Sequence, residues 1–191
     1  MSGDVYLATP FPGGALVAVV DGLGHGEDAV VAATRAIATL SAHAQDSPLL
    51  LLQQCHEQLK GTRGVVMSLA SFRAHDDHMT WVGIGDVEGV LLRGDGDAQP
   101  ARESLPLRGG VVGYQLPPLR AALLPVRPGD LLIFATDGVR RNFLQEPVLR
   151  NPLFRLAQDG PRQLADQILA RYGKATDDAL VLVARYQGAG L

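Results

Sequence analysis

The spacing of hydrophobic and polar residues predicts two short strands followed by two helices in the first third of the chain. Residues 5–8 and 15–20 are apolar runs separated by a Pro- and Gly-rich break, which is typical of two neighbouring strands. From residue 27 to 42, apolar side chains recur on one helical face. A second helix is expected to begin at Pro48, with Ser47 as its N-cap.

Strand patterns dominate the rest of the sequence. A helix is expected at 161–172, and residues 94–118 are rich in Gly, Pro and charge, which favours a loop with room for one short strand. Residues 75–78 are expected to form a hairpin turn. The predicted strands cover residues 65–72, 79–85, 87–93, 119–124, 131–136 and 179–186.

The order of these elements predicts the fold class. Strands and helices are segregated and do not alternate strictly, which favours an α+β domain of antiparallel sheets covered by helices over a parallel, doubly wound sheet. The 191 residues contain no internal repeat and no linker. We therefore expect a single domain over residues 1–191, with no sensor or membrane domain.

Composition narrows the classes of function. The chain has 17 Lys and Arg against 20 Asp and Glu, a net charge of −3, which gives no electrostatic footprint for nucleic acid or an anionic membrane. Its apolar runs are far shorter than the roughly 20 residues of a membrane helix, and no signal-peptide pattern opens it. With Cys55 as its one cysteine, the sequence fits a cytoplasmic protein.

Four aspartates lie at the ends of apolar strand patterns. Asp21 and Asp137 each follow a strand and precede a glycine, whereas Asp4 and Asp177 each precede a strand. Strand ends hold such carboxylates rigidly, and clustered carboxylates repel one another unless a cation lies between them. Oxygen ligands of this kind suit Mg²⁺ or Mn²⁺. The alternative for any one of them is a turn or cap residue, because Asp-Gly pairs are common in turns.

An ordered set of motifs resembles the type-2C (PPM) metal-dependent protein phosphatases. The form Asp-Gly-Leu-Gly-His-Gly at residues 21–26 is similar to the SpoIIE-like branch of that family. The resemblance implies a four-layer α-β-β-α sandwich with two antiparallel sheets and a two-metal centre at one end of them. The motifs that carry it are residues 2–6, 19–26, 82–86, 107–114, 135–139 and 176–184.

The same resemblance assigns roles to individual residues. Asp21 would bridge two cations, Mn²⁺ or Mg²⁺, and the Gly22 carbonyl would bind one of them. Asp137 and Asp177 would bind the other, and Asp4 would act directly or through water. Asp178 has a structural, hydrogen-bonding role as its alternative. The implied reaction is hydrolysis of phosphoserine and phosphothreonine by an activated water, without a covalent intermediate.

Two departures from the eukaryotic relatives affect how substrate is held. Leu23 occupies the position of their histidine, and no arginine precedes Asp4. His25 is a candidate proton donor to the leaving oxygen, with a packing or loop role as its alternative. Arg140 and Arg141 could meet a phosphate or an acidic partner, although a solvated pair is the simpler interpretation.

Three hypotheses about function remain open. The first is a phosphatase: the resemblance to free-standing phosphatases of this branch implies that the substrates are phosphorylated STAS-domain scaffold proteins of the stressosome, in bacterial stress signalling. The alternative is a pseudophosphatase, a non-catalytic binding module in the same pathway. An unrelated phosphoryl or nucleotide hydrolase is disfavoured by the lack of a Walker phosphate loop.

Overall fold

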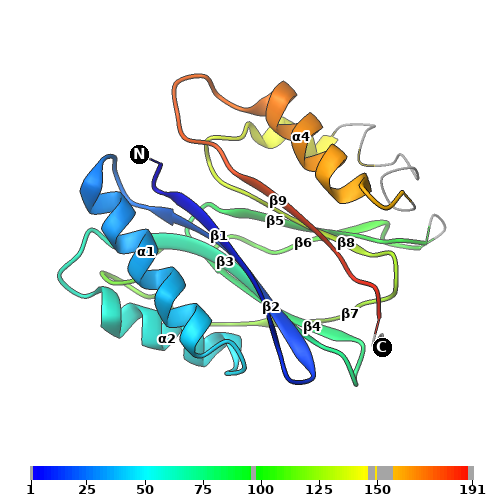
Figure 1. Ribbon diagram of the computed structural model, residues 1–191, viewed down its shortest axis with the longest axis horizontal. Coiled ribbons are helices and arrows are strands. Elements are labelled where there is room, and N and C mark those ends of the chain that lie inside the picture. The colour runs from blue at the N-terminus through cyan, green and yellow to red at the C-terminus, as the bar shows by residue number, and fades with distance from the viewer. Residues whose placement is uncertain (1, 96–97, 146–148, 150–156, 189–191) are drawn as a thin grey trace.

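A computed structural model of the chain describes residues 2–95, 98–145, 149 and 157–188. Within these ranges two antiparallel sheets stack on each other, with helices on both outer faces (Figure 1). One sheet has the order β1-β2-β3-β4-β7 and the other the order β6-β5-β8-β9. The predicted α-β-β-α sandwich is therefore confirmed.

The first sheet and its helices come mostly from the N-terminal half, and the second sheet and α4 from the C-terminal half. Consecutive pairing along the chain makes β1 to β4 a meander, whereas β7 returns from the C-terminal half to pair with β4. The elements are β1 (Asp4–Phe11), β2 (Gly14–Gly22), α1 (Glu27–Ala42), α2 (Pro48–Leu59), β3 (Val65–Arg73), β4 (His78–Ile84), β5 (Glu88–Leu92), β6 (Arg102–Ser104), β7 (Ala122–Pro125), β8 (Leu131–Ala135), the 3-10 helix η1 (Arg141–Gln145), α4 (Gly160–Tyr172) and β9 (Val181–Arg185).

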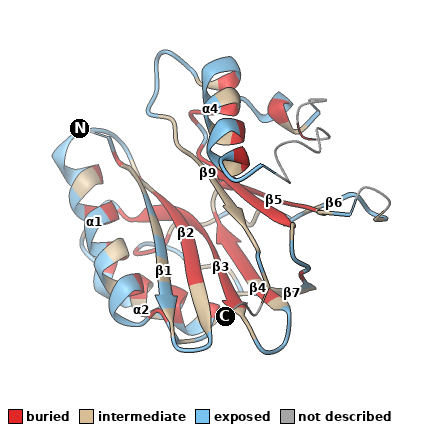
Figure 2. Ribbon diagram, turned by 45° about the vertical axis from the view of Figure 1, so that its right-hand side comes forward, coloured by how far each residue is buried: buried red, intermediate tan, exposed pale blue. Residues whose placement is uncertain are grey.

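Three apolar layers hold the sandwich together. One joins α1 and α2 to the first sheet, one fills the space between the sheets around Trp81 and Phe134, and one joins α4 and η1 to the second sheet. Figure 2 shows the central strands buried and the outward faces of the helices exposed. Removal of this apolar surface from water is the main force that stabilises such a layered fold.

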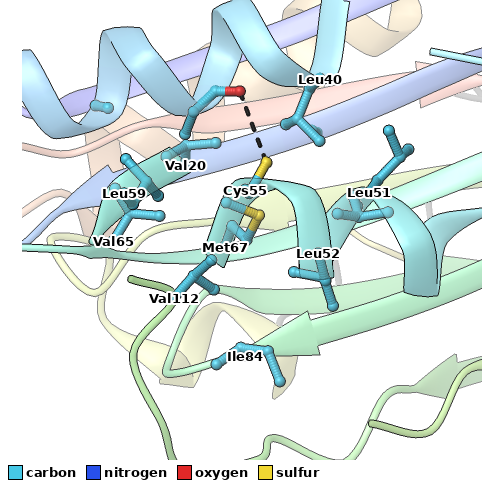
Figure 3. Packing of buried hydrophobic residues seen from close by; sticks show 14 of the residues in the cluster. Val20, Leu40, Leu51, Leu52, Cys55, Leu59, Val65, Met67, Ile84 and Val112 are labelled. Atoms are coloured by element: carbon cyan, nitrogen blue, oxygen red, sulfur yellow. Dashed lines mark hydrogen bonds between the residues drawn. The ribbon is translucent and has the colours of Figure 1, made fainter. Parts of the chain in front are cut away.

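The helix that carries the one cysteine begins as the sequence predicts. Ser47 Oγ accepts a hydrogen bond of 3.4 Å from Leu50 N, and Pro48 opens α2. Cys55 is fully buried among apolar side chains of α1, α2 and the first sheet, with Sγ 3.9 Å from the Ala36 carbonyl oxygen (Figure 3). Burial raises the pKa of the Cys55 thiol to about 12, so this cysteine is no nucleophile.

Most element boundaries lie within a few residues of their predicted positions. The turn expected at 75–78 lies between β3 and β4 except for His78, which is the first residue of β4, and the loop at 94–118 does contain one short strand, β6. The strand expected at 119–124 is β7, which covers Ala122–Pro125 because its pairing with β4 runs from Trp81 to His78. No helix in the described part of the chain is both long and apolar enough to cross a membrane.

Candidate functional site

Asp4 and Asp21 face each other across the first strand pair. The register of β1 and β2 places Asp4 opposite Asp21, and the next pair outward is closed by a hydrogen bond of 3.1 Å from Gly22 N to Gly3 O. Their carboxyl groups lie close enough for each to affect the pKa of the other. The pairing of two adjacent strands of one sheet thus brings together two acidic residues that are 17 positions apart in the chain.

A buried threonine joins these residues to the second sheet. Thr136 follows β8 directly, and its Oγ1 donates a hydrogen bond of 2.7 Å to Asp4 Oδ2. The same oxygen accepts a hydrogen bond of 2.9 Å from Leu180 N, just before β9. The ends of β1, β8 and β9 therefore meet at one hydroxyl group.

The second sheet contributes Asp137, Asp177 and Asp178 from two adjacent loops. Asp137 follows β8, whereas Asp177 and Asp178 lie in the loop from α4 to β9, at the same end of the sandwich as the N-terminus (Figure 1). A side chain on Gly138 would bring Cβ to 1.7 Å from the Asp178 carbonyl oxygen. Only glycine permits this close approach of the two loops.

The acidic residues line one cavity of about 440 Å³, called here the acidic cavity. Its described lining residues contain no lysine or arginine. His25 also lines the acidic cavity, from the exposed loop between β2 and α1. Gly22 is not among the lining residues; it packs against α1, where a Cβ on Gly22 would lie 2.2 Å from the Ala29 carbonyl oxygen. The lining residues are Gly3, Asp4, Asp21, Gly24, His25, Gly26, Asp137, Ala175, Thr176, Asp177 and Asp178.

The carboxyl groups strongly perturb one another. Burial and, to a smaller extent, the negative charges of Asp4, Asp137 and Asp86 together raise the pKa of Asp21 to about 8. Burial also raises the pKa of Asp4, helped by Asp178 and Asp137, although the hydrogen bond from Thr136 opposes the shift. These shifts mean that repulsion between the carboxylates adds to burial in favouring their protonated forms.

Asp137 is subject to charges of both signs. Burial raises its pKa, and the nearby carboxylates of Asp86 and Asp177 raise it further, whereas the positive charge of Lys174 lowers it. Asp86, in the turn after β4, is absent from the residues that the sequence pattern selected, although the Gly85-Asp86 pair resembles a family motif. Its proximity to Asp21 arises from strand pairing within the first sheet, and its proximity to Asp137 from the stacking of the two sheets.

Asp178 makes a structural contact at the rim of the acidic cavity. Its Oδ2 accepts a hydrogen bond of 3.2 Å from Gly3 N. This bond ties the loop before β9 to the residue before β1, which matches the structural alternative considered for Asp178. Asp177, its neighbour, lines the cavity and acts on the pKa of Asp137.

The donor atoms around the acidic cavity suit a hard divalent cation. Carboxylate oxygens are the preferred ligands of Mg²⁺ and Mn²⁺, and a cation would relieve the repulsion that raises the pKa of Asp21. In the described ranges, no three side chains of His, Cys, Asp or Glu lie close enough together to bind one metal ion between them. The residues fit such a cation by donor type and charge, and its binding requires the carboxylates to move closer together.

Sequence comparison with protein families gives a match over most of the chain. A family model described as Stage II sporulation protein E (SpoIIE) matches residues 12–187. No curated protein sequence matches the chain.

Solved structures share the fold over nearly the full chain. One of them comes from work that describes the bacterial stressosome as a modular system adapted to control secondary messenger signaling. It is 29% identical to this chain, the alignment covers 97% of this chain and 92% of that chain, and the TM-score is 0.84. RsbX in complex with magnesium is 18% identical, with 96% and 86% covered and a TM-score of 0.76. The Mycobacterium tuberculosis serine/threonine phosphatase PstP/Ppp is also 18% identical, with 98% and 93% covered and a TM-score of 0.74.

Proposed function

Because the chain belongs to the SpoIIE-like branch of the type-2C (PPM) metal-dependent protein phosphatases, we propose that it hydrolyses phosphoserine and phosphothreonine in proteins. The observation that carries this proposal is the set of carboxylates from both sheets around the acidic cavity, with the pKa of Asp21 raised to about 8. Such a site repels a phosphate dianion unless cations are bound. The proposed cofactors are therefore two Mn²⁺ or Mg²⁺ ions.

Each carboxylate has a proposed place in that centre. Asp21 is proposed to bridge the two cations, Asp137 and Asp177 to bind one of them, and Asp4 to bind directly or through water. When bound, such cations activate water for attack and neutralise charge on the phosphoryl oxygens. Gly22 lies outside the lining of the acidic cavity. For its carbonyl oxygen to bind one of the cations, as proposed, the backbone at Gly22 must shift slightly.

The chain's own residues supply orientation. Thr136 fixes one oxygen of Asp4, since its Oγ1 lies 2.7 Å from Asp4 Oδ2. Fixed carboxylates cost little reorganisation during the reaction, which is the main electrostatic advantage of a preformed site. His25 lines the acidic cavity and is the proposed proton donor to the leaving serine or threonine oxygen.

The proposed substrates are phosphorylated STAS-domain proteins of a stressosome, in cytoplasmic stress signalling. Support comes from the likeness to a protein from stressosome work and from the shared fold with RsbX. The substrate phosphate must be presented on a surface, because the acidic cavity opens among exposed loops that contain Gly24 to Gly26 and Thr176.

The direct test is phosphate release from p-nitrophenyl phosphate, a phosphoserine peptide and a phosphorylated STAS-domain protein, with Mn²⁺, Mg²⁺ or EDTA. We expect release with metal, none with EDTA, and a loss of at least about 100-fold in Asp21→Asn. The matched control is Asp166→Asn, the same chemical change on an exposed carboxylate of α4. Failure of all three substrates with both metals would overturn the proposal and leave a non-catalytic binding protein.

A further inference from the structure

A second cavity, of about 530 Å³, shares Asp137 with the acidic cavity and differs from it in charge. We call it the cationic groove, because three of its described lining residues, Arg140, Arg141 and Lys174, carry positive charge; they lie beside the acidic residues Asp86, Glu88 and Asp137. The acidic cavity has no lysine or arginine among those described. Among the described lining residues of the two cavities, positive charge therefore occurs only in the cationic groove, which shares Asp137 with the acidic cavity.

Backbone hydrogen bonds fix the two segments that carry these cations. Lys174 N donates to Gly138 O at 2.8 Å, and Arg140 N donates to Tyr172 O at 2.9 Å. Between them Val139 and Gly173 form an antiparallel bridge. Lys174 and Arg140 are thus attached to a short rigid ladder that begins one residue after Asp137.

The three cations are not equivalent. Arg141 forms an ion pair with Glu88, a buried carboxylate at the start of β5, so its charge is already balanced. Arg140 donates from Nη2 to the Gly173 carbonyl oxygen at 3.3 Å, a neutral partner that orients the guanidinium and leaves its charge unbalanced. Among the described residues, Lys174 forms no ion pair.

We propose that Lys174 and Arg140 bind the phosphate group of the substrate, each contacting phosphoryl oxygens next to Asp137. This inference rests on the proposed function and deepens it, by naming the residues that hold the phosphate. A phosphate dianion is recognised by a lysine point charge and by the fork of an arginine. Both residues are exposed at the mouth of the groove, so a phosphate carried on a protein surface can reach them.

The experiment measures binding of inorganic phosphate by calorimetry in the presence of Mg²⁺. In Lys174→Ala and Arg140→Ala we expect about tenfold weaker binding, because each loses one charge-assisted hydrogen bond. Lys174→Arg should restore most of the affinity. The ladder uses backbone atoms, so these substitutions leave it intact.

Two control variants separate phosphate binding from general effects of charge and stability. Arg162→Ala removes an exposed cation on α4, away from the groove, and should leave phosphate affinity unchanged. Arg141→Ala should lower the free energy of unfolding, since it leaves Glu88 buried without its partner, yet leave phosphate affinity within about twofold of wild type.

Kinetics with two substrates provide a second measurement. If Lys174 and Arg140 hold the phosphoryl group, KM rises by the same factor for p-nitrophenyl phosphate and for a phosphoserine peptide. A rise with the peptide alone would mean that the groove contacts neighbouring residues of the substrate, and would overturn the inference. So would unchanged phosphate affinity in both alanine variants. If either of these results is obtained while the wild type releases phosphate, the inference about Lys174 and Arg140 fails and the proposed phosphatase function stands. If the wild type releases no phosphate, the proposed function fails, and calorimetry with inorganic phosphate still tests the two residues.

Discussion

Thr136 Oγ1 donates a hydrogen bond of 2.7 Å to Asp4 Oδ2, and this bond joins the end of β8 in one sheet to the start of β1 in the other. Only 1% of Thr136 is exposed, and its oxygen also accepts a hydrogen bond from Leu180 N. One hydroxyl group thus fixes both the position of an acidic residue and the distance between two sheets at the site.

Thr136→Val is predicted to weaken both the fold and the site. The substitution keeps the side chain's shape but leaves Leu180 N without its acceptor and Asp4 without its donor. The free energy of unfolding should fall by about 1–3 kcal/mol, the cost of an unsatisfied buried polar group. Chemical denaturation measures this change, and calorimetry should show weaker Mn²⁺ binding. Thr136→Ser keeps the hydroxyl and should retain most of both; equal losses in the two variants would contradict the role given to the hydroxyl.

Gly138→Ala is predicted to separate the two acidic loops of the second sheet. Its Cβ would lie 1.7 Å from the Asp178 carbonyl oxygen, so the loop that contains Asp177 must move away from Asp137. We expect at least tenfold weaker Mn²⁺ binding by calorimetry, since about 1.4 kcal/mol of strain suffices for that change. Gly109→Ala is the control, because a Cβ there meets no atom within 4 Å. Normal Mn²⁺ affinity in Gly138→Ala would show that the loops need not be so close.

The pKa of Asp21 predicts how stability depends on pH when a chelator removes metal. The folded-state pKa of Asp21 is about 8, against its ordinary value of 3.8. Between these values the folded protein holds a proton that the unfolded chain has released, so the free energy of unfolding falls as pH rises from about 4 to about 8. Asp4 and Asp137 shift in the same direction. Denaturation at several pH values should show this fall, and Asp21→Asn should make it shallower. A wild-type stability that increases with pH across this range would contradict the account.

Cys55 separates a metal-dependent mechanism from a cysteine-dependent one. Because the thiol is fully buried and burial raises its pKa to about 12, Cys55→Ala should leave kcat/KM within about twofold of wild type. The folded protein should also resist thiol reagents until it is denatured. Loss of phosphatase activity in a Cys55→Ala protein that is still folded would mean that this account of the chemistry is wrong.

The sequence predicts the strand ends of the site better than the contacts between them. Asp21 and Asp137 could be selected because an apolar run precedes each and a glycine follows each, a local pattern. The involvement of Thr136 could not, because the residue belongs to an ordinary strand pattern and its partner Asp4 lies in the other sheet. Asp86 was missed for a similar reason: its effect on Asp21 arises only when the ends of β4 and β2 are brought together.

Tertiary pairing also decides where β7 lies and what Lys174 does. Residues 119–124 have a strand pattern, but pairing with β4 selects Ala122–Pro125. Lys174 has no local motif, and its place beside Asp137 depends on a backbone hydrogen bond to Gly138. Local patterns therefore predict the helices and strands and the aspartates at the strand ends, whereas the residues that orient these aspartates depend on how the two sheets stack.

The most direct test of the proposed metal centre is anomalous diffraction from a crystal of the protein soaked in Mn²⁺. The account predicts manganese peaks in the acidic cavity, with Asp21 oxygens within about 2.0–2.3 Å of the metal and Asp137 and Asp177 among the other ligands. An ordered crystal in which the acidic cavity contains no manganese peak, or in which the metal binds without Asp21, would contradict it.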